Sequence, residues 1–130
     1  MTPELYYLAL VAAFTASLWI PYILNELMQN RLTDAVGYPD SPLKFSPWAE
    51  RLKKAHYNAI ENLAPFGAVV LVANAIGVSN EATAGAAMVF FWARVVHALC
   101  YTFAIPWLRT IAFVVGWGAI ICIAWHVLMM

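Results

Sequence analysis

The first part of the sequence is a long apolar segment that contains no charged residue. It runs from Leu5 to Leu24, and a helix needs about 20 such residues, each rising about 1.5 Å, to cross the roughly 30 Å hydrocarbon core of a bilayer. Of the 130 residues, 64% are hydrophobic and 11% are charged, whereas soluble domains have about 25% charged residues. The chain is therefore expected to be an integral membrane protein.

Three more segments of similar length follow along the chain. Residues 32–47, after the first segment, are rich in proline, glycine and aspartate, which favour turns. We expect an all-α fold, a single four-helix membrane domain over residues 1–130, in which Pro65 bends the second helix. The expected helices cover about 4–28, 47–76, 81–104 and 107–128.

Lysine and arginine indicate the orientation, because they collect in cytoplasmic flanks. The loop between the second and third helices and both termini have none, so both termini are expected on the non-cytoplasmic side. The first helix lacks the basic region and cleavage site of a signal peptide and is expected to remain. A short chain of this kind suits a bacterial inner membrane. The basic residues in or beside the first and third loops are Arg31, Lys44, Arg51, Lys53, Lys54 and Arg109.

The formal net charge is zero, so nothing in the composition favours a nucleic-acid partner. The two cysteines, Cys100 and Cys122, lie inside apolar runs of separate helices. They form neither a disulfide framework nor a metal-binding pattern, and we expect both to be packing residues without a bound metal.

Polar residues continue from the first loop into the second helix. An ionisable group at the centre of a bilayer is disfavoured by roughly 2.5 to 3.5 kcal/mol, so a cluster of them indicates a functional site. Spacings of three and four residues put these side chains on one face of a helix. On the second helix they are Arg51, Lys54, Asn58, Glu61 and Pro65, and on the third they are Arg94, His97 and Tyr101.

Structural roles are an alternative for several of these residues. Basic residues near a membrane surface can simply fix topology and anchor lipid headgroups. Asn58 and Asn62 can form hydrogen bonds between helices, and Glu61 can pair with Arg94 inside the bundle. His56 is expected to be an interfacial residue.

The set as a whole fits a small zwitterionic ligand with more negative than positive groups. Glutathione is such a molecule. Arginine matches its carboxylates and a glutamate can pair with its ammonium group, while a nearby cation or hydroxyl lowers the pKa of its thiol.

The motifs resemble those of the MAPEG family, the membrane-associated proteins of eicosanoid and glutathione metabolism. The third helix is similar to the family's R-x-x-H-x-x-x-Y pattern, and Pro106, Arg109 and Thr110 are similar to a P-x-R-S segment. The resemblance covers nearly the whole chain and points to a bacterial-type member. The second helix resembles the pattern E-R-x-x-x-A-H-x-N-x-x-E followed by P-F through Glu50, Arg51, Ala55, His56, Asn58, Glu61, Pro65 and Phe66.

The resemblance implies a homotrimer that holds glutathione between neighbouring subunits and admits a lipophilic substrate from the bilayer. Arg109 and Thr110 would lie nearest the sulfur, with Arg109 stabilising the thiolate. The residues that would hold the tripeptide or line its site are Arg51, Lys54, Asn58, Glu61, Arg94, His97 and Tyr101.

Three functions are open from the sequence. The leading one is a glutathione-dependent transferase or peroxidase acting on lipophilic electrophiles or lipid hydroperoxides. The second is a lipid-binding or scaffold protein without catalysis, which is favoured by Tyr57 and Phe113, where family members have arginine and tyrosine. The third is a small four-helix transporter with Glu61 as a proton-coupled group.

Overall fold

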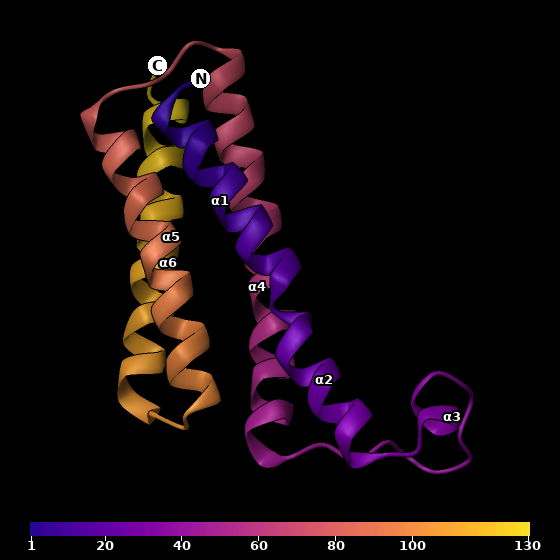
Figure 1. Ribbon diagram of the computed structural model, residues 1–130. Helices are drawn as coiled ribbons and strands as arrows, with labels where there is room; N and C mark the ends of the chain where they lie inside the picture. Colours follow the sequence, from indigo (N-terminus) through magenta and orange to yellow (C-terminus); the bar gives the residue numbers. More distant parts are fainter.

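A computed structural model describes all 130 residues, and its regular elements are all helices (Figure 1). This confirms the all-α prediction. The helices in chain order are α1 (Pro3–Ser17), α2 (Trp19–Gln29), α3 (Leu32–Ala35), α4 (Pro47–Ala75), α5 (Glu81–Thr102) and α6 (Pro106–Leu128). The short helix α3 lies inside the turn-rich connection between α2 and α4.

Figure 1 shows that α1 and α2 follow one another along α4, while α5 and α6 form a hairpin beside them. Both termini lie at one end of the bundle together with the turn from α4 to α5. The long connection from α2 to α4 and the turn from α5 to α6 lie at the opposite end, which we call the loop end.

Three helical segments are long and apolar enough to cross a membrane. They are Pro3–Gln29, Glu81–Thr102 and Pro106–Leu128, with mean hydropathies of 1.8, 1.4 and 2.2. The 29-residue α4 is not among them, because its first half carries the charged residues noted above. That α4 forms a fourth span stays a prediction.

The expected helix over residues 4–28 consists of two helices that meet at Leu18. Pro21 is the physical reason, because proline has no N–H to donate to the carbonyl of Ser17, and its ring crowds that carbonyl. The Leu18 N–H instead donates to the Thr15 carbonyl at 3.3 Å, a tighter 3₁₀-type turn.

Pro65 has a smaller effect than Pro21. α4 continues through it as one helix from Pro47 to Ala75. Its missing N–H leaves the Glu61 carbonyl without the usual helical donor, and membrane helices tolerate such a gap where neighbouring groups or water can fill it.

The core has two parts. Near the termini, Phe66 of α4 and Phe90 of α5 stack with their ring centroids 3.9 Å apart, and both are buried. Nearer the loop end, the second part of the core has fewer buried apolar residues than the first. Three of them are alanines, Ala49, Ala59 and Ala98, whose small side chains let the helices approach closely. The polar residues of interest lie in this second half of the bundle.

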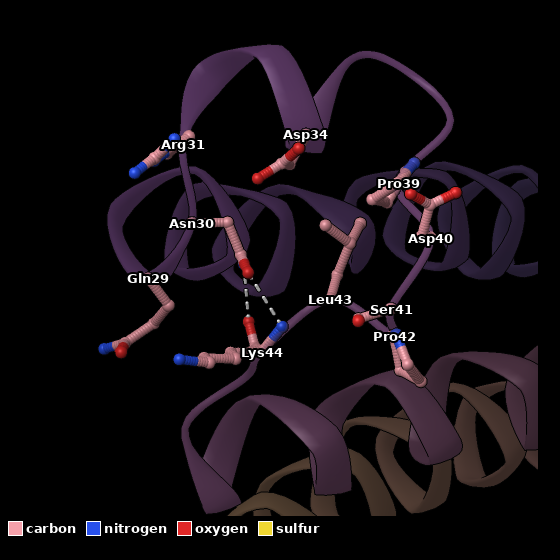
Figure 2. Close-up of a pocket in the computed structure, with 10 residues that line it drawn as sticks. All are labelled: Gln29, Asn30, Arg31, Asp34, Pro39, Asp40, Ser41, Pro42, Leu43 and Lys44. Carbon is pink, nitrogen blue, oxygen red and sulfur yellow. Dashed lines mark hydrogen bonds between the residues drawn. The ribbon is translucent and has the colours of Figure 1, made fainter.

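Asparagines hold the connection between α2 and α4 in place. Asn30 donates from Nδ2 to the Lys44 carbonyl at 2.9 Å and accepts from the Lys44 N–H at 2.9 Å (Figure 2). Asn25 makes a similar pair with Ser46, accepting from its N–H and donating to its Oγ, both at 2.8 Å. These four bonds join the end of α2 to the beginning of α4.

Glu4 joins α1 to α5 at the other end of the bundle. Its carboxylate is 2% exposed and accepts hydrogen bonds from the hydroxyls of Ser79 and Thr83. Thr83 belongs to a capping box with Asn80 at the start of α5, where a negative charge is favourable. The carboxylate therefore fixes the position of α1 against α5.

Replacing Glu4 with alanine is expected to lower the free energy of unfolding by about 1 to 3 kcal/mol, because the buried hydroxyl of Thr83 and the hydroxyl of Ser79 lose this acceptor. The measurement is thermal unfolding in detergent followed by circular dichroism. Glu81→Ala is the control, since Glu81 is exposed at the start of the same helix. An equal loss in both variants would contradict the role given to Glu4.

Candidate functional site

Arg94 lies at the centre of the polar region. Although it carries a positive charge, it is only 2% exposed. Its Nη2 donates to Asn58 Oδ1 at 2.6 Å and lies 3.4 Å from His97 Nδ1. Its Nε is buried and has no hydrogen-bond partner. The guanidinium group therefore has an unused donor and no carboxylate partner.

The polar contacts continue from His97 to the beginning of α6. His97 is buried, and its ring meets the Tyr101 ring edge to face at 5.7 Å. The guanidinium carbon of Arg109 lies 4.7 Å from the centre of the Tyr101 ring, a cation–π contact. We call Asn58, Arg94, His97, Tyr101 and Arg109 the arginine cluster.

Helix geometry explains this arrangement. Spacings of three and four residues put Arg94, His97 and Tyr101 on one face of α5. The chain then reverses at Ala104, which has a left-handed φ of 57°, and the Ile105 N–H donates to the Cys100 carbonyl at 2.8 Å. The α5–α6 turn thus brings the first turn of α6, with Arg109, back to the cluster.

Within α4, the position of Asn58 is supported by Asn62. The Asn62 side-chain amide donates to the Asn58 carbonyl at 2.9 Å and to Asn58 Oδ1 at 3.3 Å. Asn58 thus links α4 to α5, as one structural alternative expected, whereas the bonds of Asn62 stay within α4. The alternative that paired Glu61 with Arg94 is wrong, because Glu61 is exposed and Arg94 bonds to Asn58.

Four predicted site residues lie outside the cluster. Arg51 donates from Nε to the Thr102 carbonyl at 2.9 Å and so satisfies a free carbonyl at the end of α5. Lys54 and Glu61 are exposed on α4, and Thr110 is exposed on α6. A single chain therefore brings together five of the nine predicted residues, namely Asn58, Arg94, His97, Tyr101 and Arg109.

Two residues gain a role that the motifs did not indicate. Tyr22 Oη lies 2.7 Å from His56 Nδ1, and this bond joins α2 to α4. His56 is therefore a helix-joining residue, not only an interfacial one.

Phe113 lies beside the cluster, with its ring centroid 6.3 Å from that of His97, and it offers no hydroxyl there.

Two hollows border the polar region. A pocket of about 440 Å³ between α2 and α4 is lined by Glu26, Glu50, Lys53, Lys54 and Tyr57, together with loop residues. We call it the α2–α4 pocket. A groove of about 550 Å³ between α1, α2, α4 and α5 is apolar along most of its length. We call it the apolar groove.

A further polar cavity, of about 340 Å³, lies in the connection between α2 and α4 (Figure 2). Arg31, Asp34, Asp40 and Lys44 supply both signs of charge to its wall. None of the predicted site residues lines it, so the connection and the arginine cluster are separate features.

Three apolar helical segments of bilayer length define an integral membrane protein. The profile of the MAPEG family matches residues 8–129. The chain belongs to the MAPEG family, as the motifs of the second and third helices indicated.

A comparison with characterised proteins agrees with this assignment. The chain is 31% identical over 80 residues to microsomal glutathione S-transferase 1 of Mus musculus. The matched region covers 61% of this chain and 52% of the mouse protein, so the chain spans about half the length of that relative.

Asn58→Ala is expected to lower the free energy of unfolding by about 1 to 3 kcal/mol, because it removes an acceptor from the buried Arg94. Thermal unfolding in detergent measures this. Asn62→Ala, in the same helix, is expected to cost less. The double variant Asn58→Ala/Arg94→Met should recover part of the loss, since both partners are then gone. Simple additivity would contradict the coupling.

Proposed function

We propose that the protein is a glutathione-dependent membrane transferase or peroxidase that acts on lipophilic electrophiles or lipid hydroperoxides. The arginine cluster is the observation that carries this proposal. It offers the unpaired Nε of Arg94 and the guanidinium of Arg109. Such donors fit the carboxylates and the sulfur of a tripeptide that has more negative than positive groups. The likeness to a glutathione S-transferase supports the same ligand.

The chemistry follows from the charges of the cluster. Arg109 is half-buried at the beginning of α6, where a guanidinium stabilises a bound thiolate and makes it a better nucleophile at neutral pH. In conjugation, the sulfur forms a bond to the electrophilic carbon, and the thiol proton leaves to solvent or to the leaving group. Because the Tyr101 ring lies against Arg109, it limits the positions that the guanidinium can adopt.

The exposed residues of α4 support a site shared between subunits. Lys54 and Glu61 are exposed on α4, and the apolar Ile60 beside Glu61 is 48% exposed. In the proposed fourth span, charged groups facing lipid would be costly, and a second subunit that covers them would remove the cost. In the proposed homotrimer, this face of α4, with Arg51 behind it, meets the α5–α6 hairpin of a neighbour, including Thr110.

The proposed site lies at the loop end of the bundle. Since the basic residues also lie at this end, we propose that it faces the cytoplasm and that both termini face the other side, in a bacterial inner membrane. In this arrangement α4 is the fourth span of a single four-helix domain. Glutathione would enter from the aqueous side and the lipophilic substrate from the bilayer.

The apolar groove favours a second candidate function, that of a lipid-binding or scaffold protein. Its walls suit an acyl chain, and Phe113 gives the nearby cluster no hydroxyl to act on a sulfur. A lipid that copurifies in the groove, together with no effect of glutathione on thermal stability, would favour this candidate over the enzyme.

Adding glutathione to the detergent-solubilised protein is expected to produce the ultraviolet absorbance of a thiolate, and Arg109→Ala is expected to abolish it. The reason is that the guanidinium of Arg109 offsets the negative charge on sulfur. Difference spectroscopy makes the measurement. Arg31→Ala is the control, because Arg31 lies in the α2–α4 connection. A folded protein that gives no signal would exclude the catalytic proposal.

Calorimetric titration of glutathione is expected to give saturable binding to the wild type. In Glu61→Gln the affinity should fall about tenfold or more, a change of about 1.4 kcal/mol, because a charged contact with the tripeptide becomes neutral. Sedimentation must show that the variant still assembles. Glu81→Gln, at the opposite end of the bundle, should bind normally. Unchanged affinity in Glu61→Gln would remove Glu61 from the site.

A further inference from the structure

The cavity in the connection between α2 and α4 has charges of both signs in its wall, and the two signs are set apart. Figure 2 shows Arg31 and Lys44 on one side of the cavity and Asp40 on the other, with Asp34 between them. The side-chain hydrogen bonds among the lining residues are those that Asn30 makes with the backbone of Lys44. The charged groups of the wall are therefore available to a ligand.

These charges specify the chemistry of that ligand. Two basic and two acidic residues sum to zero, which suits a neutral zwitterion better than an anion. A guanidinium such as that of Arg31 binds phosphate oxygens, and carboxylates accept hydrogen bonds from an ammonium group. Quaternary ammonium groups are bound by aromatic side chains, and none lines this cavity. The wall therefore matches a phosphate joined to a primary ammonium group.

The cavity lies where the chain leaves the bilayer. The segment Pro3–Gln29 is long and apolar enough to cross a membrane, and Gln29, its last residue, is also the first residue of the cavity wall. Lipid headgroups occupy the layer just outside the hydrocarbon core. The charges of the cavity are thus at headgroup depth, whichever way the protein is oriented.

Exposed apolar side chains lie next to the cavity in sequence. Leu32 of α3 is 66% exposed and Val36, at the end of α3, is 73% exposed. Their spacing of four residues puts them on one face of the short helix. Tyr38 is fully exposed, and Figure 1 shows α3 to one side of the bundle. Apolar and tyrosine side chains gain free energy when they enter the interfacial layer of a bilayer, so this segment fits a lipid better than a water-soluble ligand.

We propose that the connection between α2 and α4 binds a phospholipid with a phosphate and a primary ammonium group in its headgroup, as in phosphatidylethanolamine. Arg31 and Lys44 bind the phosphate, and Asp34 and Asp40 bind the ammonium group. The bonds of Asn30 hold the two ends of the connection together before the lipid binds, which lowers the cost of ordering the site. This site is separate from the apolar groove and does not depend on the proposed glutathione chemistry.

The test is native mass spectrometry of the delipidated full chain in detergent. The probes are phosphatidylethanolamine, phosphatidylglycerol and phosphatidylcholine with the same acyl chains. The wild type is expected to bind the first about threefold or more tightly than the other two, the effect of an exposed charged contact. Asp34→Asn/Asp40→Asn is expected to lose this preference. Arg31→Ala is expected to weaken all three lipids by about threefold. The control Lys53→Gln, in the α2–α4 pocket, should bind as the wild type does.

The other outcomes overturn the proposal. One is a wild type that binds either of the other lipids as tightly as phosphatidylethanolamine, and another is a preference that survives in the double aspartate variant. Equal weakening by Lys53→Gln and Arg31→Ala would show a general attraction between basic residues and lipid instead of a site.

Two further arms distinguish the competing occupants. Soluble glycerophosphoethanolamine is expected to bind at least tenfold more weakly than the lipid, because it lacks acyl chains for the apolar residues, and equal binding would overturn the lipid assignment. Variants that change the number of subunits but not lipid binding would show that a neighbouring subunit covers the connection. Should the double aspartate variant not fold, Asp40→Asn, at an exposed position, takes its place with the same criteria.

Discussion

The hydrogen bond between Arg94 and Asn58 is the contact on which the polar half of the bundle depends. A buried guanidinium needs acceptors, and the only strong one that the chain provides comes from α4. This bond fixes α4 against α5 at the depth where the apolar core changes to polar residues. His97 and Tyr101 follow from Arg94 along the same face of α5, so their positions depend on that contact too.

The chain accommodates its charged residues in three physically different ways. Arg51 bonds to a free carbonyl at the end of α5, and Arg109 lies against an aromatic ring, so each is satisfied within the chain. Glu4 is satisfied by hydroxyls at the opposite end. The exposed residues of α4 have no such partner. The contacts of Arg51, Arg109 and Glu4 hold the fold together. The charged residues without a partner are the ones from which a ligand or a second subunit can gain binding energy.

Much of this arrangement could be predicted from residue spacing. The all-α fold, the turn-rich connection after the first helix and the common face of Arg94, His97 and Tyr101 each follow from local periodicity, which acts over three or four residues. The break at Leu18 was missed, although Pro21 was a visible signal for it. The choice of Asn58 over Glu61 as the partner of Arg94 was not predictable, because both lie on the same side of α4 and the helix rotation decides between them.

By itself, the sequence determined that this is an apolar helical protein with polar stripes on two helices, and its motifs indicated the family. Those properties depend on composition and on the 3.6-residue period of the helix, which need no knowledge of distant contacts. Only the tertiary structure decided which stripe residues meet, that Arg51 binds the end of α5, and that Glu26 lines one pocket together with two lysines. Such outcomes depend on how helices far apart in the chain rotate and pack against one another, and that packing is set by the whole core.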